Sequence, residues 1–384
     1  MSKASAEDQT KHARVWMVMN PCQGGKVLLR VAAIVLVAVG LAVLAAAPTV
    51  GQTEAASAAQ TVPTTQSARP SFAAWVKGLR AEAMERGISP SLFDEAFQGV
   101  SPVQRILELD QSQPELKATA ADYMASRLNE QRIRRGQEIM ANSAEILAAI
   151  SQDFKVEPQF IVALWGVETD YGANRLNQNA VRSLATLAYG GRRAAYFRKE
   201  LLDCLWIIQN RRIDPASLKS SWAGALGQIQ FMPSSYLAKA STRDGRRPPA
   251  AWPDIWDNQG DMLASIANYL ALTGWRPGLG WGEEVEPPTS PALLGLVGIA
   301  NQKTLAEWRT LGVVAMARPG NPALSDGTVM ASLIRARDQD GPYYLVTENF
   351  RHILKWNRSL VFAIVVGRLA DQLANPDRTQ QREE

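Results

Sequence analysis

IVALWGVETDYG, which runs from Ile161 to Gly172, decides the fold because it predicts a short apolar helix that carries one glutamate. Pro158 is typical of a first helical turn, and Gly172 is typical of a helix end. The i, i+3, i+4, i+7 spacing places four side chains on one helical face: Ile161, Leu164, Trp165 and Glu168. Glu168 is therefore expected to point toward the core from the last turn of the helix.

This position is unusual for a carboxylate. Burial disfavours the charged form and so does the negative end of the helix dipole, so both effects are expected to raise the pKa of Glu168. A carboxyl group that stays protonated near neutral pH can protonate a leaving oxygen. Glu168 is therefore the first candidate for a catalytic general acid.

The histidine and cysteine contents exclude several kinds of active site. The 384 residues include only two of each, and His12 and Cys22 lie in the leading segment. The remaining His352 and Cys204 cannot build an intrachain disulfide, a Cys/His zinc cluster or a multi-histidine metal site. Cys204 lies among leucines at helical spacing, which favours a buried, inert thiol. We therefore expect no metal and no cofactor, and a catalytic centre made of carboxylates and neutral polar groups.

The leading segment predicts export. Residues 31–47 form an uncharged apolar run, preceded by Lys26 and Arg30 and followed by small residues at 56–58. This order indicates either a signal peptide within residues 1–58 or an uncleaved inner-membrane anchor, and both place the body in the periplasm. Five basic and two acidic residues precede the apolar run and account for +3 of the +4 net charge, so the nearly neutral body predicts no nucleic-acid partner. Residues 59–70 are expected to be a flexible linker, and 376–384 a disordered polar tail.

The body of the chain is expected to be mainly α-helical. Apolar periodicity predicts helices at 72–85, 91–97, 114–135, 137–154, 158–172, 194–210, 259–272, 304–311 and 359–373. The interval 313–348 differs, because short β-prone runs at 328–333 and 342–347 are separated by Gly and Asp. A small antiparallel sheet is therefore predicted there.

A second motif, SWAGALGQIQFMPSSY at Ser221 to Tyr236, supplies neutral polar groups. Its small residues allow close backbone approach, so Ser221, Gln228 or Gln230 could present a hydroxyl or an amide to a cleft. Such groups are suited to bind sugar hydroxyls and N-acetyl groups. The alternative is a tight structural turn between helices.

Together these segments resemble the membrane-bound lytic murein transglycosylase B family, whose members are glycoside hydrolases that cleave murein. The resemblance extends over about residues 72–373 and rests on GVETDYG, GGRRA at 190–194, the 221–236 motif, IANYLALTGW at 266–275, KTLAEW at 303–308 and ILKWNRS at 353–359. It implies a lysozyme-like α+β catalytic core with an additional helical region, within a catalytic domain at 71–375. It also implies peptidoglycan glycan strands as the substrate, and we expect a monomer.

The resemblance implies roles for individual residues. Glu168 matches the catalytic glutamate, and Ser221 and Gln230 match residues that contact the sugar beside the scissile bond. The residues that match the lining of the substrate groove are Tyr123, Arg192, Arg193, Tyr269, Trp356 and Asn357. Trp356 stands where the family more usually has Tyr, which keeps a stacking surface and loses a hydroxyl. For the two arginines, a solvated charge pair is the alternative.

One loop departs from the family pattern. Members often carry a calcium-binding loop after the Ser-Ser-Tyr segment, with aspartates at alternating positions before an Asp-Gly. Here Asp244 and Gly245 are retained, but Thr242 and Ala240 occupy the positions two and four residues before Asp244. With one carboxylate where three are expected, we predict no structural metal.

The chemistry predicted for Glu168 follows from the lack of a second carboxylate. Glycosidases generally use two, but Asp170 lies two residues along the helix and points about 200° away from Glu168. One carboxylate fits the substrate-assisted reaction that the resemblance implies. In that reaction the 2-acetamido oxygen attacks the anomeric carbon, and the sugar's own 6-hydroxyl then forms a 1,6-anhydromuramoyl end. The alternatives are a hydrolytic muramidase on the same fold and a non-catalytic murein-binding scaffold.

Overall fold

The structure is a computed structural model that describes residues 69–112, 119–174, 176–316, 324–336 and 341–375, all within the compact unit Ser67–Glu384. The apolar run at 31–47, the linker up to residue 68 and the tail at 376–384 lie outside these residues. No helix in the described ranges combines the length and the apolar character needed to cross a membrane.

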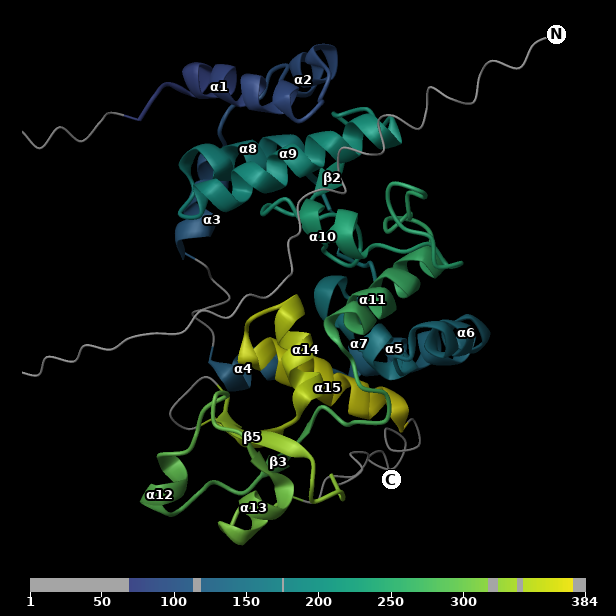
Figure 1. The fold of residues 1–384 in the computed structure, drawn as a ribbon, viewed down its shortest axis with the longest axis vertical. Helices are drawn as coiled ribbons and strands as arrows, with labels where there is room; N and C mark the ends of the chain where they lie inside the picture. Colours follow the sequence, from purple (N-terminus) through teal and green to yellow (C-terminus); the bar gives the residue numbers. More distant parts are fainter. Residues whose placement is uncertain (1–68, 113–118, 175, 317–323, 337–340, 376–384) are drawn as a thin grey trace, which may run out of the picture. The chain divides into compact units, whose positions relative to one another are not determined.

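Helices make up most of the described chain (Figure 1). Their bounds are α1 Phe72–Glu85, α2 Pro90–Ala96, α3 Gln104–Ser112, α4 Ala120–Arg127, α5 Glu130–Asn142, α6 Ala144–Phe154, α7 Pro158–Thr169, α8 Ala180–Gly190, α9 Ala194–Arg211, α10 Pro233–Lys239, α11 Gln259–Thr273, α12 Pro291–Leu294, α13 Leu305–Thr310, α14 Glu348–Trp356 and α15 Leu360–Ala374. The strands are β1 Gln178–Asn179, β2 Lys219–Ser220, β3 Gly282–Val285, β4 Lys303–Thr304, β5 Met330–Arg335 and β6 Tyr343–Val346. A mainly helical fold with a small antiparallel sheet near its C-terminal part is thereby confirmed.

Side-chain caps set many of the helix starts. Ser71 caps α1 and Ser359 caps α15, each by accepting a backbone N–H from the first turn. The predicted helices 114–135 and 137–154 have the wrong boundaries, because the chain leaves the helical conformation within each of them. Asn129 starts α5 by accepting the N–H of Arg132 at 2.9 Å, and Ser143 separates α5 from α6.

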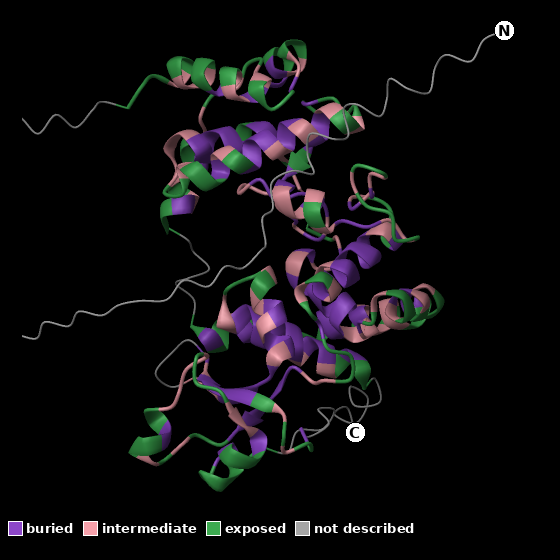
Figure 2. Cartoon of the chain, viewed as in Figure 1, coloured by how far each residue is buried: buried purple, intermediate pink, exposed green. Residues whose placement is uncertain are grey.

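Helix α7 lies at the centre of the helical core. Residues 160–167 are all buried, and α5, α6, α11 and α15 pack around them (Figure 2). The spacing predicted one apolar face, but the helix is apolar on every side, as a fully enclosed helix must be. Glu168 is the exception in its last turn, since its side chain is only half-buried. The expectation that Glu168 points into the core is therefore wrong, and the carboxylate instead faces a cavity.

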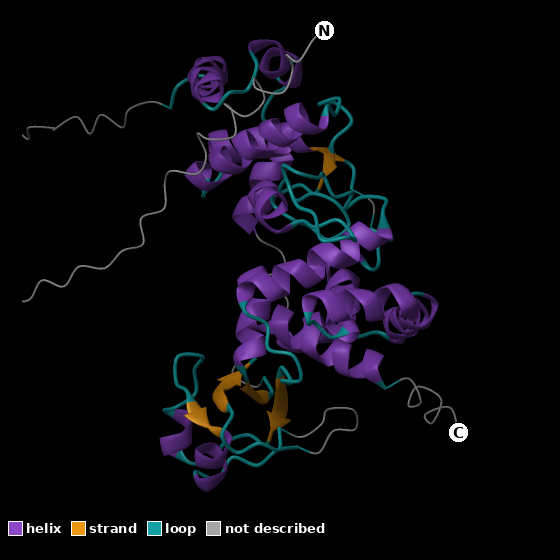
Figure 3. Cartoon of the chain, turned by 45° about the vertical axis from the view of Figure 1, so that its right-hand side comes forward, coloured by secondary structure: helices purple, strands orange, loops and turns teal. Residues whose placement is uncertain are grey.

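Two antiparallel sheets accompany the helices (Figure 3). The larger has the strand order β3-β6-β5-β4, and in its register Leu333 lies opposite Leu345. Strands β5 and β6 fall at the predicted runs 328–333 and 342–347, whereas β3 and β4 come earlier in the chain than the predicted interval 313–348. The smaller sheet pairs β1 with β2 and places Gln178 opposite Ser220.

Trp281 joins the larger sheet to the helical core. Its ring packs on Gly367 of α15 so closely that a Cβ atom at Gly367 would lie 2.2 Å from a ring carbon. The Trp281 indole N–H donates to a carboxylate oxygen of Asp371 at 3.0 Å. Helix α15 therefore contacts α7 on one side and holds the sheet on another.

Helix α14 packs against the end of α11 through His352, which is only 4% exposed. Lys355 Nζ lies 3.3 Å from His352 Nδ1 and donates to the carbonyl of Thr273 at 2.8 Å, while Glu348 Oε1 lies 3.9 Å from His352 Nε2. Burial, and then the charge of Lys355, lower the pKa of His352 below 6.5. This histidine is therefore buried in its neutral form.

His352 is expected to make the fold less stable in mild acid. Because its folded-state pKa is lowered, the unfolded chain binds the proton first as the pH falls below about 6.5, and the free energy of unfolding decreases. The melting temperature of the wild type should therefore fall more between pH about 7.5 and 5.5 than that of His352→Gln. Equal falls in the two proteins would show that His352 contributes nothing to the pH dependence.

Candidate active site

The turn after α7 sets the orientation of Glu168. The helix ends because Asp170 adopts the left-handed conformation at φ 54°, and Tyr171 and Gly172 follow with φ values of 56° and 81°. Gly172 was the predicted stop, but the left-handed turn begins two residues earlier. Arg132 holds it there, since its Nε donates to Asp170 Oδ1 at 2.9 Å. Asp170 is thereby committed to an ion pair on α5.

Glu168 lines a cavity of about 410 Å³ together with Ser221 and Gln230. The structure therefore brings together the three residues predicted to act beside the scissile bond. The other lining residues are Thr169, Asn174, Leu176, Asn177, Gln178, Ser220 and Trp222. Most of these residues were not predicted, although several of them follow Glu168 closely in the chain. Of the described residues that line this cavity, Glu168 is the only acid.

Ser221 and Gln230 line the cavity and are also held by a tight turn. The motif therefore presents polar groups to a cleft and forms a structural turn at the same time. Ser221 Oγ accepts the N–H of Ala225 at 3.2 Å, and Gln230 donates from Nε2 to the carbonyl of Gly227 at 3.0 Å. Gln230 has a positive φ of 55°, which turns its side chain out of the regular path of the backbone. Both polar side chains therefore have fixed positions beside Glu168.

Gln228, the third polar candidate of this motif, is used to hold the site together. Its Oε1 accepts from Trp165 Nε1 at 3.2 Å, and its Nε2 donates to the carbonyl of Trp256 at 2.6 Å. Its own carbonyl accepts from Thr169 Oγ1 at 2.6 Å. The amide thus ties the end of α7 to the loop before α11.

Gly172 is expected to be indispensable for this arrangement. A Cβ atom there would lie 2.1 Å from Gln228 Oε1, and its φ of 81° is unfavourable for any other residue. The left-handed conformation alone costs about 1–2 kcal/mol and the overlap adds about 1–3 kcal/mol, so Gly172→Ala should lower the free energy of unfolding by about 3 kcal/mol.

Gly245→Ala is the matched control for Gly172→Ala in urea unfolding. Gly245 has nearly the same φ of 82°, but nothing lies within 4 Å of a Cβ atom placed on it. This variant should lose only the conformational part, about 1–2 kcal/mol. Equal losses in the two variants would show that the contact with Gln228 is unimportant.

Trp356 reaches Glu168 from α14. Its indole N–H donates to Glu168 Oε1 at 2.7 Å, although 188 residues separate the two in the chain. The Trp356 ring lies 4.6 Å from the Tyr269 ring and 5.1 Å from the Phe231 ring, measured between centroids. Tyr269 in turn donates its hydroxyl to the carbonyl of Lys355 at 2.6 Å. These aromatic rings therefore pack beside the glutamate, and the indole fixes one of its oxygens.

The other predicted groove residues do not line the 410 Å³ cavity. Arg192 is exposed and pairs with the buried Asp110. Its backbone N–H donates to one carboxylate oxygen of Asp110, and its guanidinium lies beside the other. Arg193 lies over the rings of Tyr196 and Phe197 at the start of α9. Tyr123 is on α4, and the Arg127 guanidinium lies over its ring. Asn357 follows the last residue of α14, and its side-chain oxygen accepts the N–H of Ser359. Their contacts with substrate stay predictions.

The residues of the Asp244 loop do not fit a calcium ion. Thr242 donates to one carboxylate oxygen of Asp244, and Arg246 Nε donates to the other at 2.8 Å. Hydrogen bonds from Thr242 and then Arg246 hold the pKa of Asp244 below its usual value. In the described ranges no group of three or more His, Cys, Asp or Glu side chains is placed to hold a metal.

Cys204 is fully buried, and its burial raises the pKa of the thiol.

Comparison with known proteins shows that this chain is similar to transglycosylases. The model of the Transglycosylase SLT domain matches residues 71–371. Membrane-bound lytic murein transglycosylase B of Escherichia coli K12 is 31% identical over 226 residues, and the aligned stretch spans 58% of this chain and 58% of that protein.

Solved structures are also similar. SltB3 from Pseudomonas aeruginosa in complex with NAG-NAM-pentapeptide has a TM-score of 0.71 and 39% identity, with 79% of each chain covered, and a second complex of SltB3 contains NAG-anhNAM-pentapeptide. The Escherichia coli lytic transglycosylase Slt35 in complex with calcium has a TM-score of 0.66 and 25% identity, covering 79% of this chain and 94% of that one.

Proposed function

The chain belongs to the Transglycosylase SLT domain family, and from that premise we propose that it is a lytic transglycosylase of peptidoglycan. We infer that it cleaves the β-1,4 bond between N-acetylmuramic acid and N-acetylglucosamine without consuming water. The observation that carries this proposal is that Glu168 is the only acid among the described residues lining its cavity, while Asp170 is paired with Arg132. A two-carboxylate hydrolysis therefore lacks its second group.

The proposed reaction has two steps at Glu168. In the first, its carboxyl group gives a proton to the glycosidic oxygen, and the 2-acetamido oxygen of the muramic acid forms a bond to the anomeric carbon as the bond to the leaving sugar breaks. In the second, the Glu168 carboxylate takes the proton of the 6-hydroxyl, whose oxygen bonds to the anomeric carbon and displaces the acetamido oxygen. Glu168 is then protonated again, and the product is a 1,6-anhydro sugar.

The neighbours of Glu168 suit these steps. Ser221 and Gln230, in the same cavity, would hold the acetamido group in position for its attack. Trp356 would keep one carboxyl oxygen of Glu168 in place through its N–H bond. The SltB3 complexes support the proposal, because a relative with 39% identity binds both a NAM and an anhydro-NAM ligand.

Location and extent are part of the same proposal. We infer a periplasmic enzyme whose catalytic domain covers residues 71–375, with residues 31–47 serving as a cleaved signal or as an inner-membrane anchor. We further propose that the enzyme is a monomer that needs no metal or other cofactor.

Product analysis tests the proposed reaction. The purified body, lacking residues 1–58, should release muropeptides from murein sacculi whose muramic acid is lighter by one water than the hydrolysed sugar. Muropeptides with a reducing end as the main product would identify a hydrolytic muramidase instead. No released muropeptides at all would favour a binding scaffold.

A further inference from the structure

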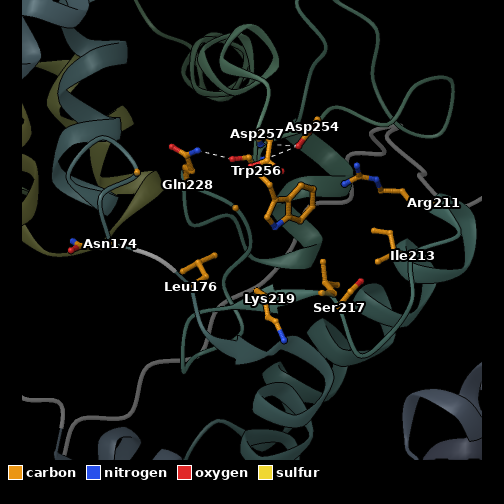
Figure 4. Close-up of a pocket in the computed structure, with 13 residues that line it drawn as sticks. Asn174, Leu176, Arg211, Ile213, Ser217, Lys219, Gln228, Asp254, Trp256 and Asp257 are labelled. Carbon is orange, nitrogen blue, oxygen red and sulfur yellow. Dashed lines mark hydrogen bonds between the residues drawn. The ribbon is translucent and has the colours of Figure 1, made fainter.

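A second cavity, of about 680 Å³, is larger than the Glu168 cavity, and Figure 4 shows the residues that line it. The two share Asn174 and Leu176 in their walls, so they are neighbours on the same side of the turn that follows α7. The end of α9, strand β2 and the loop before α11 complete the larger cavity, and Figure 4 shows the Trp256 indole standing among the side chains that line it. Ser221 and Gln230, which match the residues that contact the sugar beside the scissile bond, do not line this cavity.

Four charged side chains of both signs line this second cavity: Arg211, Lys219, Asp254 and Asp257. In the described part of the chain none of them belongs to an ion pair, whereas on α9 Arg198 pairs with Glu82 and Lys199 pairs with Asp203. Asp254 Oδ1 accepts the backbone N–H groups of Trp256 and Asp257, which fixes that carboxylate at the cavity wall. Two cations and two anions are thus available to a ligand.

Arg211 and Trp256 contact each other in the cavity wall. The Arg211 guanidinium stacks on the Trp256 ring at 4.6 Å from its centroid. Arg211 lines the cavity and belongs to no ion pair among the described residues, so its guanidinium, which carries five N–H donors, favours a ligand that brings an acceptor. A carboxylate is the strongest acceptor for a guanidinium.

We propose that the second cavity binds the peptide stem of peptidoglycan. This inference rests on the proposed function, because the stem would belong to a glycan strand whose sugar occupies the Glu168 cavity. A neutral sugar has no use for unpaired charges of both signs, whereas a peptide stem carries carboxylate and amino groups together. Arg211 and Lys219 bind its carboxylates, Asp254 and Asp257 bind its amino group, and the Trp256 ring packs on its apolar side chains.

The position of Arg211 in the fold adds to this inference. It is the last residue of α9, and Arg193 stands directly before the first, so the two lie about 27 Å apart along an 18-residue helix. A tetrapeptide stem spans at most about 14 Å when it is fully extended. A stem bound at Arg211 therefore does not also reach Arg192 and Arg193.

Calorimetric titration with two ligands tests this inference. The protein carries Glu168→Gln so that neither ligand is cleaved, and the ligands are the disaccharide N-acetylglucosaminyl-N-acetylmuramic acid with and without a tetrapeptide stem. Adding Arg211→Gln should reduce the ratio of the two affinities about tenfold, since one charged hydrogen bond is lost. Adding Lys219→Gln and Asp257→Asn together, at two exposed side chains, should reduce the same ratio and does not depend on the packing of Arg211.

Arg134→Gln is the matched control, because Arg134 is exposed on α5 and pairs only with the exposed Glu130 among the described residues. The control should leave the affinity ratio unchanged. An unchanged ratio in the Lys219/Asp257 double variant and in any folded Arg211 variant would overturn the inference, even if both affinities fell together. Binding of neither ligand by the parent protein would contradict the proposed function itself.

Discussion

Glu168→Gln is expected to reduce the rate of murein cleavage by about 10³-fold, within the range that general acid-base catalysis contributes. Glutamine has nearly the same size and keeps an oxygen that can accept the N–H of Trp356, so the fold should not change. It cannot, however, protonate the glycosidic oxygen or take up the proton of the 6-hydroxyl. The loss should appear in the clearing of purified murein sacculi, while the melting temperature stays near that of the wild type.

Asp170→Asn is the matched control, because it neutralises the nearest acid in the sequence. Asp170 pairs with Arg132, whose side chain is 7% exposed, but is itself 30% exposed, so the variant should be less stable by about 1–2 kcal/mol. It should still clear murein at a temperature where it is folded. A folded Asp170→Asn protein as inactive as Glu168→Gln would mean that a second carboxylate takes part. Undiminished clearing by Glu168→Gln would leave Glu168 without a catalytic role.

Trp356→Phe should give the second-largest loss of activity. The variant keeps an aromatic ring against Tyr269 and Phe231 but removes the N–H that donates to Glu168 Oε1 at 2.7 Å. A hydrogen bond to a charged group is worth about 1.5–3 kcal/mol, which corresponds to a loss of about 10–100-fold in kcat.

Trp356→Tyr separates the hydrogen bond from the ring. Tyrosine restores a donor, so kcat should recover at least partly relative to Trp356→Phe, while KM should be similar in the two variants. If the bond positions Glu168, the two variants therefore differ in kcat. If Trp356 served only as a stacking surface, they would share the same kcat and differ from the wild type in KM.

The helices were largely predictable because their signals are local. Ser71 and Ser359 mark the starts of α1 and α15, and the apolar periodicity that follows each cap marks their length. The strands that were missed have no such signal. Strands β1 and β2 contain two residues each and pair across 40 positions of sequence, and β3 contains two glutamates, which are disfavoured in strands.

The site was predictable to the extent that its residues lie in compact motifs. The apolar helix drew attention to Glu168, although its side chain faces a cavity and not the core. The segment rich in small residues left Ser221, Gln228 and Gln230 as candidates, and only the resemblance to the family selected Ser221 and Gln230. The bond from Trp356 to Glu168 joins positions 188 residues apart and depends on how α14 packs beside α7, so the sequence revealed the ring but not the hydrogen bond. Asn174 and Leu176 lie in irregular backbone, for which periodicity gives no information.

Digestion of murein in water enriched in oxygen-18 tests most directly whether the 6-hydroxyl, and not water, completes the reaction at Glu168. If Glu168 deprotonates the 6-hydroxyl and that oxygen bonds to the anomeric carbon, the new muramic acid ends carry no label, because no oxygen of the product comes from solvent. Mass analysis of the released muropeptides should then find unlabelled anhydro ends. Ends that contain one solvent oxygen each would show hydrolysis and contradict the single-carboxylate mechanism.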